Sequence, residues 1–150
     1  MRKMSNKFIF LSKEFYNDYP TNNYPEIEQK ETRPYIQVVI NIDDIIFAIP
    51  MRSNINHPYA LFTDKANKCG LDFSKTVVIN DDKYIEKNKT PYIRPNEFNA
   101  LRGKEYRIKK KLMEYIKKYK KAKADSTLPF AHEIVSNSTL QYFEKYISNM

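Results

Sequence analysis

The sequence has little glycine, one cysteine, two histidines and no tryptophan. Two glycines in 150 residues argue against a glycine-built nucleotide loop, and neither GxGxxG nor GxxxxGK[ST] occurs. The single cysteine, Cys69, excludes an internal disulfide and a cysteine-based zinc site and is typical of a reducing compartment. His57 and His132 are too few for a histidine-rich metal site, so we predict neither a metal nor another cofactor.

The chain also lacks a long hydrophobic run. The N-terminal run Phe8–Leu11 is far shorter than a signal peptide or a membrane helix requires. We therefore predict a cytoplasmic protein with no membrane partner. Hydrophobic residues make up 41% of the chain, which is enough for a compact core. A length of 150 residues favours one domain spanning 1–150.

Positive charge is abundant and concentrated. The net charge is +8, and the segment Arg102–Lys123 alone holds eleven Lys or Arg against two Glu, so the rest of the chain carries about −1. Such a run is often only a solvated helix face, and a basic amphipathic helix can also lie on a membrane. Because nearly all charged residues of this segment are positive, we expect it to bind nucleic-acid phosphates. Such contacts give affinity without sequence information. The expected contacts on this segment are Arg107, Lys109, Lys110, Lys111, Lys117 and Lys118.

A β-hairpin is the clearest element of the sequence. Tyr35–Ile42 is rich in β-branched residues, Asp43-Asp44 is a turn pair, and Ile45–Ile49 returns. Pro50 is expected to end the second strand because proline cannot donate to a ladder. Later runs at Tyr59–Phe62 and Lys75–Ile79 predict two more strands.

The second half of the chain predicts helices. Apolar residues recur at intervals of 3, 7, 4, 3 and 4, which is one face of a single long helix, roughly Glu97–Lys121. These residues are Phe98, Leu101, Ile108, Leu112, Tyr115 and Tyr119. We expect Gly103 to weaken this helix without breaking it, and Ser138 to cap a last helix. The predicted fold class is α+β, with a short antiparallel sheet and helices grouped late.

A polar cluster lies between the strand-like runs at Phe47 and Ile79. Cleavage of RNA by its own 2′-hydroxyl needs a base, an acid and cations that stabilise the phosphorane charge. The candidate catalytic residues are Ser53, His57, Arg52, Lys65, Asp64 and Lys75. The candidate RNA-binding residues near them are Arg33, Tyr35, Asn54, Asn56, Thr63 and Ser74.

Other interpretations fit some of these residues. A Ser/His/Asp hydrolase has its residue types present, but the GxSxG elbow is missing. A metal nuclease has the pairs Asp43-Asp44 and Asp81-Asp82, although aspartate is expected at hairpin turns in any case. A non-catalytic RNA- or DNA-binding regulator would use the same basic helix, and His57 would then be a structural loop histidine.

The order of motifs resembles one family of toxins. YIQVVINI, the return FAIP, then MRSNINH, and later TDK and GLDFSKTVVI are similar to the toxins of type III toxin–antitoxin systems, the ToxN and AbiQ-like endoribonucleases, and closest to the CptN branch. The resemblance covers most of the chain, about Phe8–Ile147. It implies a compact, strongly twisted antiparallel sheet with flanking helices, distantly like MazF and Kid.

The resemblance also implies an activity and a partner. The activity is metal-independent, sequence-selective RNA cleavage that leaves 2′,3′-cyclic phosphate and 5′-hydroxyl ends on cellular or phage RNA. The partner is a repeat-encoded antitoxin RNA pseudoknot, which the toxin cuts from a precursor and holds in a closed protein–RNA assembly. The setting is growth arrest and phage defence by abortive infection.

Only part of the family's site matches residue by residue. The family has a Thr-Ser pair after the strand return, and Ser53 matches its serine while Arg52 replaces its threonine. The family's nearby lysine falls on Ile55, so its role passes to His57 or Lys65. A basic residue before the first hairpin strand matches Arg33.

Overall fold

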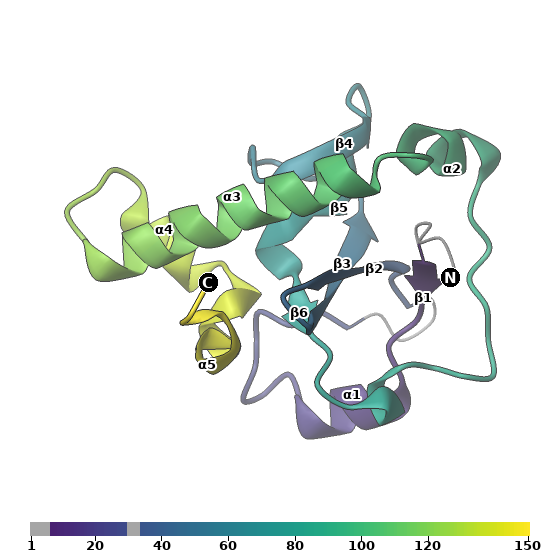
Figure 1. Cartoon of the computed structure of the whole chain (residues 1–150), viewed down its shortest axis with the longest axis horizontal. Helices are drawn as coiled ribbons and strands as arrows, with labels where there is room; N and C mark the ends of the chain where they lie inside the picture. The colour runs from purple at the N-terminus through teal and green to yellow at the C-terminus, as the bar shows by residue number, and fades with distance from the viewer. Residues whose placement is uncertain (1–6, 30–33) are drawn as a thin grey trace.

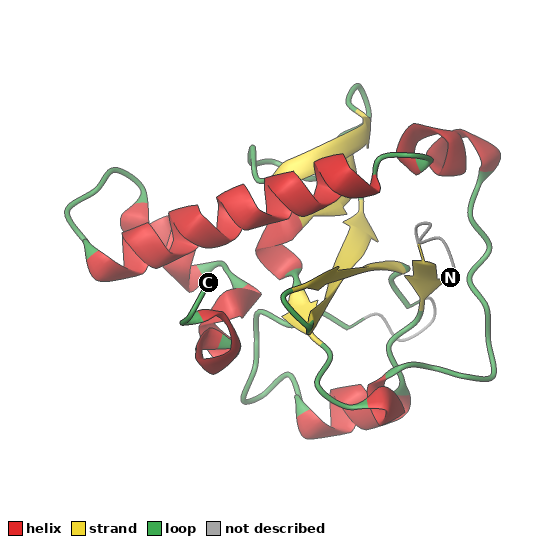
Figure 2. Ribbon diagram, viewed as in Figure 1, coloured by secondary structure: helices red, strands yellow, loops and turns green. Residues whose placement is uncertain are grey.

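The computed structural model describes residues 7–29 and 34–150, in which an antiparallel sheet is flanked by helices (Figure 1, Figure 2). The main path of the sheet runs β1 (Lys7–Ile9), β2 (Gln37–Ile42), β3 (Ile45–Arg52), β5 (Cys69–Asp72), β4 (Ala60–Asp64), and β6 (Val77–Val78) pairs with β3. All pairings are antiparallel. The predicted α+β class with an antiparallel sheet is confirmed.

The helices follow the sheet in the second half of the chain, apart from α1. The α-helices are α1 (Lys13–Asp18), α2 (Pro95–Leu101), α3 (Glu105–Ala124), α4 (Ala131–Ser136) and α5 (Glu144–Ile147). Short 3-10 turns are η1 (Phe73–Lys75), η2 (Asp82–Tyr84) and η3 (Thr139–Tyr142). Helix α3 lies along one side of the sheet, and α4 packs beside it (Figure 1). None of the helices in the described residues is both long enough and apolar enough to cross a bilayer.

The core is centred on the β2–β3 hairpin and α3. Ile40, Phe47 and Ile49 are at most 1% exposed, and so are Ile108 and Leu112 of α3. Burying side chains of this size stabilises the fold by about 1.5–3 kcal/mol each. The buried face predicted for the basic helix is therefore confirmed from Ile108 onwards, and its lysines lie on the remaining surface.

The hairpin is confirmed, but its second strand is longer than expected. Asp43 and Asp44 have φ values of 53° and 67°, the left-handed backbone of a two-residue hairpin turn. The prediction that Pro50 ends the strand is wrong, because β3 continues to Arg52. Pro50 lies opposite Gln37, and the next amide, Met51 N, donates to a carbonyl oxygen at 2.8 Å, so the ladder resumes. The extension brings the end of β3 beside β5.

The single long helix predicted over Glu97–Lys121 is also wrong. Gly103 has φ of 74°, a left-handed conformation that ends α2 and lets α3 start in a new direction. The first helix begins at Pro95 with Arg94 as N-cap, two residues earlier than the pattern indicated. Leu101 of α2 and Ile108 of α3 are both fully buried, as the apolar spacing predicted, although they belong to two separate helices.

The remaining predictions of elements are partly right. The strand expected at Tyr59–Phe62 is β4, whereas Lys75–Ile79 forms only β6 after the turn η1. Ser138 does act as a cap, since its Oγ accepts from the Leu140 amide at 3.1 Å. It caps the 3-10 turn η3, and the last α-helix starts later, at Glu144.

Candidate functional site

A buried carboxylate, Asp72, organises the polar cluster. Asp72 ends β5, is fully buried, and caps η1 by accepting from the Ser74 amide at 3.0 Å and the Ser74 hydroxyl at 2.6 Å. Arg52 donates to its other oxygen at 2.6 Å, and His57 Nε2 lies 3.1 Å from Oδ1. Burial by itself would raise the pKa of Asp72, but hydrogen bonds from His57, Ser74 and Arg52 outweigh it and lower that pKa. The cluster is thus built around a fixed negative charge.

His57 is held at both ring nitrogens. Nδ1 accepts from the backbone N–H of Tyr59 at 3.0 Å, so the proton of the neutral ring is on Nε2, which donates to Asp72. The ring lies against that of Tyr59, with centroids 5.6 Å apart and an interplanar angle of 27°. Proton transfer at Nδ1 would require loss of the backbone bond. One face of the ring is thus covered by Tyr59, and 30% of the His57 side chain stays exposed.

Ser74, His57 and Asp72 have the residue types of a hydrolase triad but a different geometry. The Ser74 hydroxyl lies 3.3 Å from Nε2, the same nitrogen that meets Asp72, and it donates to Asp72 itself. A triad places serine and aspartate at opposite ring nitrogens. The triad considered from the sequence, with Ser53 and Asp64, is not brought together by any hydrogen bond to His57 among the described residues.

Arg52 is a positioned cation at the end of β3. It bridges Asp72 and Glu28, and its guanidinium lies 5.7 Å from the centre of the Tyr35 ring. Burial would lower the pKa of Arg52, but hydrogen bonding to Asp72 and the charge of Glu28 raise it. With 19% of its side chain exposed, Arg52 presents one edge to the surface in a fixed orientation.

Next to Arg52, the side chain of Ser53 opens into a cleft of about 410 Å³, here called the Ser53 cleft. Its lining includes Tyr35, Arg52, Ser53, Cys69, Tyr92, Arg94 and Glu97. The Ser53 hydroxyl has no hydrogen-bond partner among residues 7–29 and 34–150, and within those residues Arg94 has no ion pair. The cleft therefore combines a free hydroxyl, a free guanidinium and three aromatic residues, Phe10, Tyr35 and Tyr92. Arg33, expected here from the resemblance, lies outside the described residues.

The β4–β5 turn borders this cleft, because Cys69 lines it and pairs with Asp64. Asp64 organises the turn by accepting from the Asn67 amide at 3.3 Å and its side chain at 2.7 Å. Lys65 is exposed in the turn. The Thr63 hydroxyl donates to the Cys69 carbonyl at 3.4 Å. Asp64 and Thr63 thus hold the turn, and Lys65 is available to a ligand.

A lysine that the sequence analysis missed joins this turn to the loop after β3. Lys68 Nζ donates to Asn56 Oδ1 at 2.9 Å, and the Asn56 side chain donates to the Asn54 carbonyl at 3.1 Å. Ile55 between them is buried and bonds Lys68 through its backbone. Lys68 and Arg94 lie far along the chain from Ser53, so no local motif marked them.

Lys75 belongs to a structural contact. Its ammonium group donates to Glu26 at 2.7 Å and to the backbone carbonyl of Asn137 at 3.0 Å. Its side chain is 13% exposed. Lys75 therefore ties η1 to the N-terminal loop and to the end of α4, and its charge is already paired.

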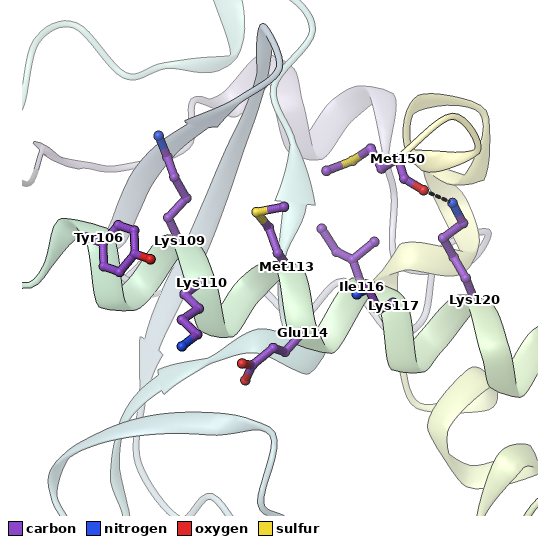
Figure 3. A pocket seen from close by; sticks show the side chains of 9 residues that line it. All are labelled: Tyr106, Lys109, Lys110, Met113, Glu114, Ile116, Lys117, Lys120 and Met150. Carbon is purple, nitrogen blue, oxygen red and sulfur yellow. Dashed lines mark hydrogen bonds between the residues drawn. The ribbon is translucent and has the colours of Figure 1, made fainter.

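The exposed side of α3 carries a basic groove of about 350 Å³ (Figure 3). Met113 is 46% exposed and Tyr106 is 77% exposed, whereas Ile116 lines the groove but is almost fully buried. The basic residues that line the groove are Lys109, Lys110, Lys117 and Lys120. Lys120 is anchored to the backbone carbonyl of Met150 (Figure 3). The other predicted contacts, Arg107, Lys111 and Lys118, are also on the surface of α3 but outside this groove.

The paired aspartates occupy turns. Asp43-Asp44 forms the β2–β3 turn, Asp81 caps η2, and Asp82 pairs with Lys87 at 2.5 Å. No group of three or more His, Cys, Asp or Glu side chains in the described part of the chain is arranged to hold a metal ion.

Comparison of the chain with family models, curated proteins and solved structures gives no match. The functional interpretation therefore depends on the geometry of the Ser53 cleft, its neighbouring residues and the charge of α3.

Proposed function

We propose that this protein is a metal-independent endoribonuclease of the type III toxin kind, with the Ser53 cleft as its active site. The observation that carries the proposal is the position of Ser53. Its unpaired hydroxyl lies directly after β3 in a cleft that is also lined by Arg52, Arg94 and three aromatic residues. Single-stranded RNA needs such a combination of cations for phosphates and rings for bases.

In this proposal the attacking group is the RNA 2′-hydroxyl, and the products are a 2′,3′-cyclic phosphate and a 5′-hydroxyl. Ser53 donates a hydrogen bond to the phosphate or orients the 2′-hydroxyl. Arg94, which has no described ion pair, stabilises the negative charge that develops on the phosphorane, and Arg52 adds a guanidinium already oriented by Asp72. Proton transfer falls to Lys65 or Lys68 on the adjacent turn, because both nitrogens of His57 are engaged.

The basic surface of α3 supplies the affinity for RNA. Helix Glu105–Ala124 holds nine Lys or Arg against two Glu, and these cations lie on its exposed flanks. The partner we propose for this surface is a folded antitoxin RNA, a pseudoknot that inhibits the enzyme in a closed assembly. Cellular or phage RNA is the substrate, and growth arrest in the bacterial cytoplasm is the biological outcome.

One set of contacts favours a second candidate, a non-catalytic RNA-binding regulator. Four of the six catalytic candidates are engaged internally and already have structural roles: Arg52, His57, Asp64 and Lys75. A regulator would bind RNA through α3 and the Ser53 cleft without cutting it.

The two candidates differ in what purified protein does to RNA in EDTA. The nuclease should cut a mixed-sequence RNA with chelator present and leave cyclic phosphate ends. These ends resist a 3′-end ligase until the ring is opened and the phosphate is removed. Ser53→Ala should bind the same RNA without cutting it. Cutting that requires added Mg²⁺ would refute the mechanism, and binding without cutting by the wild-type protein would establish the regulator.

A further inference from the structure

Beyond the Ser53 cleft, we infer that a second pocket next to the cluster binds a purine base of single-stranded RNA and so selects the substrate sequence. This inference rests on the proposed function for the identity of the ligand as RNA. The pocket, here called the His57 pocket, has a volume of about 390 Å³ and forms where the loop after β3 meets α4. Its lining includes His57, Tyr59, Phe130, Glu133 and Asn137.

One wall of the His57 pocket is a rigid aromatic platform. The rings of His57 and Tyr59 are stacked, and Tyr59 in turn lies 5.7 Å from the buried ring of Tyr115. The His57 ring cannot rotate without losing hydrogen bonds to Asp72 and to the Tyr59 amide. A ring fixed in this way loses little further entropy when a base stacks on it, so it is suited to binding bases.

The α4 side of the pocket presents a second aromatic ring. Phe130 is 71% exposed and has φ of 63°, a left-handed backbone that non-glycine residues rarely adopt. The next residue, Ala131, is buried, so the segment is anchored while the phenyl ring stays at the surface. An exposed aromatic in an unfavourable backbone conformation at the mouth of a pocket indicates a binding role.

Two polar side chains set the choice of base. Glu133 and Asn137 lie one turn apart at the pocket, and neither side chain has a hydrogen bond or ion pair with another described residue. A carboxylate accepts from an exocyclic amino group, which adenine, guanine and cytosine have and uracil lacks. A side-chain amide both donates and accepts, as a purine edge requires. The larger area of a purine also gives more contact with the aromatic rings.

The pocket is placed to act on the same RNA strand as the Ser53 cleft. Arg52 of the cleft and His57 of the pocket bind opposite oxygens of the Asp72 carboxylate. Only residues 54–56 separate Ser53 from His57 in the chain. A nucleotide bound in the His57 pocket would therefore fix which phosphate meets Ser53.

The absence of tryptophan permits a direct test. Phe130→Trp places a single indole at the pocket mouth, and its fluorescence is titrated with AMP, GMP, CMP and UMP. We expect saturable quenching by AMP or GMP, with UMP at least about tenfold weaker, because uracil has no exocyclic amino group for the Glu133 carboxylate and a smaller ring to stack. Adding Glu133→Ala should reduce that discrimination, whereas His132→Ala on the same helix, outside the pocket, should not. Equal affinity for all four nucleotides, or no quenching, overturns the inference.

A second measurement uses the unaltered side chains. Amide chemical shifts of the wild-type protein should move on addition of AMP at Tyr59 and Glu133, and shifts confined to other parts of the chain also overturn the inference. The outcome is separable from that of the nuclease proposal. If the protein selects purines but cuts no RNA, the nuclease proposal is refuted and the purine pocket stands. If it cuts RNA but shows no purine selectivity, the pocket is refuted and the nuclease proposal stands.

Discussion

Replacing Asp72 by asparagine tests whether the buried carboxylate holds the site together. The side chain keeps its shape, loses its charge and exchanges one oxygen for an NH2 donor, so either Arg52, 2.6 Å from Oδ2, or His57, 3.1 Å from Oδ1, loses its acceptor. Removing one partner of a buried ion pair typically costs about 3–5 kcal/mol. Arg52 is 19% exposed and retains Glu28, so we expect the lower end, about 3 kcal/mol. At about 2–4 °C per kcal/mol for a chain of this size, the melting temperature should fall by roughly 10 °C.

The pH dependence of the Asp72→Asn effect gives a sharper check. The pKa of Asp72 is lowered below 3.8, so its stabilising contribution is complete above about pH 4 and is lost as the pH falls through the folded-state pKa. The difference in unfolding free energy between wild type and variant should therefore shrink in acid. Asp64→Asn, at a half-buried residue of the β4–β5 turn, is the matched control and should cost under about 1 kcal/mol. A cost for Asp72→Asn no larger than the control, or a difference independent of pH, would refute the central role of Asp72.

Two further predictions concern the proposed nuclease. Ser53→Ala should lower RNA cleavage by at least about a hundredfold. The melting temperature should not change, because the Ser53 hydroxyl makes no hydrogen bond within the described residues. Cleavage near the wild-type rate would show that Ser53 is not in the active site. Changing Lys109, Lys110 and Lys111 together to alanine should reduce the slope of log affinity against log salt by roughly 0.7–0.9 for each phosphate that the variant no longer binds. A slope equal to that of the wild type would show that this side of α3 is only solvated.

Local patterns predicted the elements whose cause is local. The hairpin follows from β-branched residues around Asp43-Asp44, whose side chains and backbone suit a tight turn. The buried side of α3 follows from apolar spacing. Pro50 was misjudged because its missing N–H is tolerated when the flanking amide of Met51 continues the ladder. The prediction of one helix through Gly103 was wrong because helix propensity gives only the free-energy cost of a glycine inside a helix. It does not predict that the glycine takes a left-handed backbone conformation and ends the helix.

The site depends on contacts that sequence spacing does not reveal. The local sequence around Asp72 is only that of a capping residue, yet Asp72 joins Arg52 from 20 residues earlier with His57 from the intervening loop. Ser53 and His57 are four residues apart in the chain but line different pockets, and their spacing gives no sign of the backbone bond that occupies Nδ1 of His57. Arg94 enters the cleft from beyond the sheet, and only the tertiary path of the chain brings it there.

The left-handed residue at Gly103 has a consequence for the shape of the Ser53 cleft. Arg94 and Glu97, at the start of α2, form part of the cleft wall, whereas α3 is fixed against the sheet. In Figure 1, α2 lies as a separate helix beyond the start of α3. A continuous helix through Gly103 would carry Arg94 and Glu97 to a different position. Ser53 would then lie on an open edge with one fewer guanidinium beside it. Gly103 does not line the cleft, yet it determines where α2 places the cleft wall. Lengthening or straightening the connection between α2 and α3 should therefore change access to Ser53 without altering any residue that lines the cleft.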